Sequence, residues 1–170
     1  MRPPRTMTAR ARSRIASRGF TLLELVIAVA ILSIIVVMAV PVVRLEMQRQ
    51  REAELRQDLR MLREAIDAYK RATDEGRVKK SADASGYPAR LEDLLEGVPD
   101  AKHPKERAIF FLRRIPRDPF NANESLSPAE TWGRRSYASP PDAPEEGEDV
   151  FDVYSLADGT GINGVPYRDW

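Results

Sequence analysis

The chain contains no cysteine and only one histidine, and aromatic residues make up 7% of it. Without cysteine, no disulfide can hold the fold together. The lone His103 has no neighbours at metal-ligand spacing, and no serine–histidine or cysteine–histidine constellation indicates nucleophilic catalysis. We therefore expect a loop histidine exposed to solvent and a protein that is not an enzyme.

Acidic residues are absent before Glu24, whereas six arginines precede Gly19. From Leu25 to Val43 the sequence has no charge, and Ser33 is its one polar residue. About 20 apolar residues cross a bilayer as a helix, so residues 20–43 are long enough for one span. By the positive-inside rule, the arginine-rich end stays in the cytoplasm and everything after the span is extracytoplasmic.

Glu24 stands alone near the start of this apolar segment. A carboxylate in hydrocarbon costs about 2.5–3.5 kcal/mol on insertion scales, which makes Glu24 a candidate functional residue with an expected partner. Three interpretations compete: a signal peptide cleaved after Ala39, an uncleaved signal anchor, and cleavage between Gly19 and Phe20. The apolar run is longer than the usual 7–15 residues of a signal peptide, which disfavours the first.

The run Gly19-Phe20-Thr21-Leu22-Leu23-Glu24, after a basic leader, resembles the prepilin signature of type IV pilins and type II secretion pseudopilins. The resemblance implies that a prepilin peptidase cuts after Gly19 and methylates the new amine of Phe20. It also implies that Glu24 is the assembly glutamate and that Pro41 is the kinking proline of such helices. A plain kink at the membrane interface is the alternative role for Pro41.

The chemistry of the cleaved end agrees with this role. A new α-amine has a reference pKa of about 7.7–8.0 and is largely protonated near neutrality. The cation at Phe20 of one subunit could then neutralise Glu24 of a neighbour within a bundle of apolar helices, where an unpaired carboxylate is costly. Pairing of Glu24 with the amine of its own chain is the alternative.

Residues 44–73 contain no glycine or proline and predict a continuation of the helix. An apolar stripe recurs at spacings of four, three, four and three, formed by Leu55, Leu59, Leu62, Ile66 and Tyr69. We expect this stripe to pack on the globular domain, with a dimeric coiled coil as the alternative. Residues 44–54 lack such a pattern and are expected to project freely. A helix over residues 20–73 would be roughly 80 Å long.

Residues 74–170 read as a small globular head. A short helix is predicted over 89–95, and strands over 108–115, 132–138 and 150–156. The predicted fold class is therefore α+β and pilin-like: a long N-terminal helix packed on a small antiparallel sheet with a C-terminal loop. The predicted divisions are a leader (1–19), an assembly helix (20–43), its amphipathic continuation (44–73) and the periplasmic head (74–170).

The head also resembles a narrower family, the major pseudopilin of type II secretion. The motifs that carry the resemblance are Gly86-Tyr87-Pro88, residues 115–120 (Ile-Pro-Arg-Asp-Pro-Phe), Trp132-Gly133, and residues 152–155 (Asp-Val-Tyr-Ser) through Asp158-Gly159. The resemblance implies an inner-membrane protein that polymerises with itself and other pseudopilins on an assembly platform to drive export. A type IV pilus subunit and a membrane-anchored binding module that never polymerises are the alternatives.

Members of this family often hold Ca²⁺ in the loop after the last strand. Ser155, Asp158 and Asn163 match that region and offer oxygen ligands, which Ca²⁺ prefers. The second loop aspartate of the family pattern is missing, so a plain glycine-rich turn is the alternative.

Other partners and activities are less well supported. The chain without its leader is mildly acidic and has no basic patch for nucleic acid. Carboxylates cluster over residues 142–152, where a glycosidase pair could be sought, but a solvated acidic loop explains them better.

Overall fold

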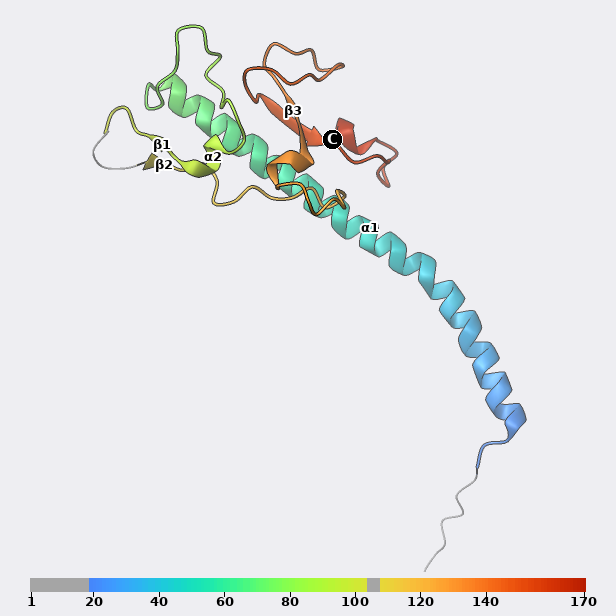
Figure 1. The fold of residues 1–170 in the computed structure, drawn as a ribbon. Coiled ribbons are helices and arrows are strands. Elements are labelled where there is room, and N and C mark those ends of the chain that lie inside the picture. The colour runs from blue at the N-terminus through green and yellow to red at the C-terminus, as the bar shows by residue number, and fades with distance from the viewer. Residues whose placement is uncertain (1–18, 104–107) are drawn as a thin grey trace, which may run out of the picture. The chain divides into compact units, whose positions relative to one another are not determined.

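The computed structural model describes residues 19–103 and 108–170. The chain divides into two units, Met1–Val43 and Arg44–Trp170, and helix α1 (Leu22–Asp74) contributes residues to both (Figure 1). Of the predicted leader, all but Gly19 lies outside the described residues.

Helix α1 confirms the long helix expected over residues 20–73, and it comprises 53 residues. Pro41 is its one internal proline. The helix ends where Gly76 takes a positive φ of 71°, with the Gly76 N–H donating to the Thr73 carbonyl at 2.9 Å. A glycine in this left-handed conformation is a common way for a helix to end.

The apolar stripe of α1 forms one wall of the head's core. Leu55, Leu59, Leu62 and Ile66 are all at most 2% exposed. They belong to one cluster with Trp132 and other head residues, as expected for a stripe that packs on the globular domain. The dimeric coiled coil is wrong, because this stripe is already buried within its own chain.

The strands form two separate antiparallel pairs rather than the single sheet expected. One pair joins β1 (Val98–Pro99) to β2 (Ala108–Ile109), and the other joins β3 (Trp132–Arg135) to β4 (Asp152–Ser155). In the second pair the register places Trp132 opposite Ser155 and Arg135 opposite Asp152.

The helix predicted over 89–95 and the strand predicted over 108–115 are both shorter than expected, because the chain reverses direction between them. Helix α2 covers Asp93–Glu96 and stops at Gly97, whose φ is 82°. The Phe111 and Leu112 N–H groups both donate to the Leu94 carbonyl, at 3.1 and 2.9 Å. These two N–H groups therefore cannot pair with a neighbouring strand, and the strand expected over 108–115 ends at Ile109.

The Trp132-Gly133 motif fixes the second strand pair to the core. Trp132 is 1% exposed, and its Nε1 donates to the Pro116 carbonyl at 2.9 Å. Gly133 lies opposite Tyr154, and a Cβ atom on Gly133 would come within 2.4 Å of that ring. Glycine is thus required here by the close approach of the tyrosine.

Candidate functional site

The predicted cleavage position lies immediately before α1. Gly19, Phe20 and Thr21 precede the first helical residue, and the Phe20 side chain is 81% exposed. A Cβ atom on Gly19 would meet no described atom within 4 Å, and Gly19 does not have a positive φ. Nothing in the described chain therefore requires glycine at this position, as expected where an external partner such as a peptidase reads it.

Thr21 caps the start of the helix. Its Oγ1 accepts a hydrogen bond from the Glu24 N–H at 3.2 Å, and its carbonyl accepts one from the Leu25 N–H at 3.1 Å. A threonine followed three residues later by a glutamate is the capping-box pattern, and a carboxylate in the first turn also favours the helix dipole. Our sequence reasoning missed this role of Thr21, although the Thr21–Glu24 spacing could have indicated it.

The Glu24 side chain is exposed and stays available for an intermolecular partner. Among residues 19–103 and 108–170, no hydrogen bond or ion pair engages its carboxylate. Glu24 and Phe20 both lie at the start of the helix, but no hydrogen bond or ion pair among the described residues links the Glu24 carboxylate to Phe20. The predicted contact between subunits is not tested by a single chain.

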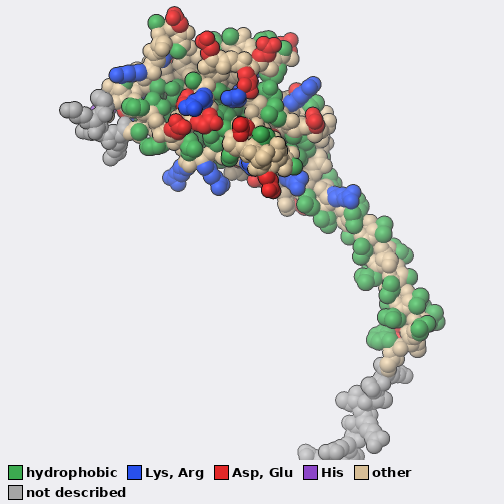
Figure 2. All heavy atoms as spheres, viewed as in Figure 1, with side chains coloured by type: hydrophobic (Ala, Val, Ile, Leu, Met, Phe, Trp, Pro, Cys, Tyr) green, Lys and Arg blue, Asp and Glu red, His purple; other side chains and the backbone are tan. Residues whose placement is uncertain are grey.

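The segment that follows is exposed along its whole length in the part of the chain that the structure describes. Every residue from Gly19 to Val43 is exposed, and Figure 2 shows hydrophobic side chains along this part of α1. Ser33 donates to the Val29 carbonyl at 2.8 Å, so the one polar side chain inside the run is satisfied locally. By length and composition α1 can cross a membrane, which together with the N-terminal motif supports membrane anchoring.

Pro41 lies inside α1, two residues before the boundary between the two units. Proline has no N–H, so the carbonyl four residues earlier loses its helical partner here. A role for this missing hydrogen bond in filament assembly stays a prediction, and a plain kink at the membrane interface is the alternative.

The three residues of the predicted calcium loop do not share one environment. Ser155 is fully buried, donates to Asp118 Oδ2 at 2.5 Å and accepts from the Ala157 N–H at 3.1 Å. Asp158 and Asn163 are exposed, and Asn163 Oδ1 accepts from the Val165 N–H at 3.1 Å. Ser155 is thus committed to the core, which leaves Asp158 and Asn163 as the side-chain ligands on which the calcium prediction depends.

The C-terminal segment is fastened to α1 by a buried carboxylate that our sequence reasoning did not single out. Glu52 is 3% exposed, and its Oε1 accepts hydrogen bonds from Gln48 Nε2, the Ile162 N–H and the Tyr167 hydroxyl, at 3.0, 2.8 and 3.1 Å. The expectation that residues 44–54 project freely is therefore wrong from Gln48 onward. This expectation rested only on apolar periodicity and therefore missed the polar residue Glu52.

Arg63 fastens strand β4 and the last residue to the same helix. Its Nε donates to Asp152 Oδ1 at 2.8 Å, and its guanidinium also donates to the carbonyls of Val153 and Trp170, at 3.1 and 2.7 Å. About two turns earlier, the Arg56 guanidinium lies 4.2 Å from the centre of the Trp170 ring. Arg63 thus joins the helix to residues about 90 and 107 positions further along the chain.

Asp58 is a second buried acid on α1, 8% exposed. Burial raises its pKa to about 6, the nearby Glu54 and Asp118 add to the rise, and Arg114 opposes it. Asp58 therefore titrates near neutrality inside the head.

Comparison with known proteins bears on the N-terminal segment alone. Residues 14–40 match the family model described as "Prokaryotic N-terminal methylation motif". No curated protein and no solved structure matches the chain. The motif supports a type IV pilin-like protein with a prepilin-type N-terminus, and proteins with this motif are structural subunits. It is common to secretion pseudopilins and pilus subunits.

Proposed function

We propose that this chain is a structural subunit of a type II secretion pseudopilus that helps to drive protein export. The methylation motif at residues 14–40 carries the proposal, and the uncovered apolar segment that follows it agrees. The resemblance of the head motifs, among them Trp132-Gly133, favours secretion over a surface pilus.

In this proposal a prepilin peptidase cuts after Gly19 and methylates Phe20. The arginine-rich leader stays in the cytoplasm, and the head occupies the periplasm of a bacterium with two membranes. The subunit then joins copies of itself and other pseudopilins on an inner-membrane assembly platform.

Glu24 would direct this assembly. Its carboxylate has no partner within the described chain, and burying it unpaired in hydrocarbon is costly. A neighbour's methylated amine at Phe20 would supply the opposite charge. The subunit would thus be more stable in a filament than alone in the membrane.

Deletion of the gene, followed by complementation, tests the proposal. We expect the deletion strain to lose exported proteins from its medium, to keep any surface pili, and to recover export with the wild-type gene. Loss of surface pili with export intact would overturn the proposal in favour of a type IV pilus subunit. Normal export and normal pili in the deletion strain, with the chain cleaved in the wild-type strain, would instead support a binding module that does not polymerise.

A further inference from the structure

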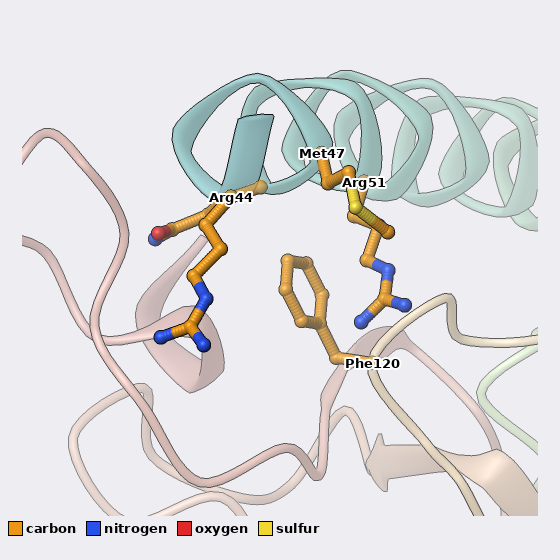
Figure 3. A pocket seen from close by; sticks show the side chains of 5 residues that line it. Arg44, Met47, Arg51 and Phe120 are labelled. Atoms are coloured by element: carbon orange, nitrogen blue, oxygen red, sulfur yellow. The ribbon is translucent and has the colours of Figure 1, made fainter. Parts of the chain in front are cut away.

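A pocket lies at the beginning of the second unit, where α1 leaves its apolar run. It has a volume of about 330 Å³ and is lined by Arg44, Met47, Gln48, Arg51 and Phe120 (Figure 3). This volume is at the lower end of the range for small-ligand sites. None of its lining residues belongs to the cleavage segment or to the C-terminal loop.

Helix geometry and one loop contact bring the lining together. The four helical residues follow the spacing 0, 3, 4 and 7, so they share one face of α1. Phe120 comes from the loop after Asp118, whose Oδ1 accepts the Phe120 N–H at 2.8 Å. Its ring stacks on Tyr167 with centroids 4.2 Å apart, and Figure 3 shows it between the Arg44 and Arg51 side chains.

The two arginines give the pocket an uncompensated positive charge. Both are exposed, and neither has an ion-pair partner among the described residues. Two carboxylates on this stretch of helix are engaged with other arginines: Glu46 lies 3.8 Å from Arg49, and the buried Glu52 lies 3.7 Å from Arg56. No residue that lines the pocket is acidic.

We propose that this pocket binds the headgroup of an anionic phospholipid. Arg44 is the first charged residue after the apolar segment, so in a membrane-anchored chain it lies at the lipid–water interface. Guanidinium groups bind phosphate through paired hydrogen bonds, and Met47 and Phe120 offer apolar contact for the glycerol and the first methylene groups. The absence of an acid favours a net anionic headgroup over a zwitterionic one, whose cation would find no carboxylate in the lining.

The inference depends on membrane anchoring and not on polymerisation or secretion. A headgroup bound at Arg44 and Arg51 would hold the start of the head unit to the lipid surface. It would add a specific contact to the non-specific attraction of basic residues for anionic lipid.

Native mass spectrometry of the full chain in detergent, titrated with phosphatidylglycerol, tests the site. We expect Arg44→Gln with Arg51→Gln to weaken phosphatidylglycerol binding by about 25-fold, or about five-fold for each charge removed. Arg49→Gln is the control for the loss of a single charge, because Arg49 lies between the two positions and does not line the pocket, and its effect is compared with the loss of about five-fold expected for each pocket arginine. It should change the affinity less than two-fold.

Three further measurements keep the proposal falsifiable. Phosphatidylcholine should bind at least ten-fold more weakly than phosphatidylglycerol, and glycerol 3-phosphate, which lacks the acyl chains, should bind more weakly than the lipid. Arg44→Lys with Arg51→Lys keeps both charges but not the paired hydrogen bonds, so its binding should lie between those of the wild type and the glutamine variant. An equal loss with Arg49→Gln, equal binding of both lipids, tighter binding of glycerol 3-phosphate than of the lipid, or a loss with lysine as large as with glutamine would each overturn the proposal.

Discussion

The Tyr167 hydroxyl donates a hydrogen bond to the buried Glu52 carboxylate, 3.1 Å away, and so joins the C-terminal segment to helix α1. The same carboxylate oxygen accepts the Ile162 N–H at 2.8 Å. Burial raises the pKa of Tyr167, and the Glu52 carboxylate raises it further, against an opposing hydrogen bond from Gln48. The tyrosine therefore stays protonated, as a donor must.

Removal of the Glu52 carboxylate should destabilise the head. Glu52→Leu leaves three donors without their acceptor, of which the Tyr167 hydroxyl is buried, and we expect the free energy of unfolding to fall by about 3 kcal/mol. Tyr167→Phe removes one bond to a charged group and should cost about 1.5 kcal/mol. Urea denaturation of the detergent-solubilised chain, followed by circular dichroism, measures both. Glu64→Leu, at an exposed position of α1, should stay within about 0.5 kcal/mol of wild type.

Because of Asp58, the head should become less stable as the pH rises from about 4 to about 6. Its folded pKa of about 6 lies above the ordinary value of 3.8, so the folded state binds more protons between these values. The free energy of unfolding should therefore fall as the pH rises from about 4 to about 6, because ionised Asp58 is disfavoured by burial. The difference between wild type and Asp58→Asn, measured by urea denaturation across this range, isolates the effect. A pH-independent difference would contradict it.

The mature chain should begin at Phe20 and carry a methyl group on its amine. The exposed Gly19–Phe20 bond lies outside the helix, where a peptidase can reach extended backbone. Intact-mass analysis of the protein from native membranes decides the point. A mature N-terminus at Val40 would instead indicate a conventional signal peptide cleaved after Ala39 and would contradict the pilin-like interpretation.

Replacement of Glu24 should abolish assembly without blocking cleavage. Glu24→Leu removes the charge that neutralises a neighbour's amine, so filaments should fail to form or form out of register when it is the only copy. Glu24→Asp keeps the charge on a shorter side chain and should give an intermediate result. Crosslinking of subunits in the membrane, compared with leader processing, measures the two steps separately.

Thr21→Ala is the control that separates charge from capping. It removes the hydrogen bond to the Glu24 N–H, worth about 1 kcal/mol to the helix, but keeps the carboxylate. We expect Thr21→Ala to assemble. If it failed as Glu24→Leu does, the helix start and not the charge would be the requirement, and normal filaments from Glu24→Leu would show that Glu24 is no assembly contact.

Calcium should stabilise the head if Asp158 and Asn163 hold it. Linkage predicts a loss of about 2.7 kcal/mol on chelation when the free ion had been at a hundred times its dissociation constant. Thermal melting with calcium and with chelator measures the loss, and Asp158→Ala should melt alike in both. Equal melting of the wild type in both conditions would leave the loop as a glycine-rich turn.

The sequence by itself determined the long helix and the N-terminal site, because both depend on local patterns. The charge-free run from Leu25 to Val43 and the stripe from Leu55 to Ile66 carry their own periodicity and length. The Gly19–Glu24 motif is likewise contiguous, so no tertiary contact was needed to assemble it.

Only the tertiary structure decided how the head is held together, because its strands are short and its contacts join distant residues. The strand expected over 108–115 ends at Ile109, since the next donors bond to Leu94 in the turn after α2. Glu52 carries no sequence signal of burial, yet it is buried, since Ile162 and Tyr167 reach it from more than a hundred positions away. No local pattern encodes such partners, and for that reason the polar core and the pocket beside Phe120 emerged only from the fold.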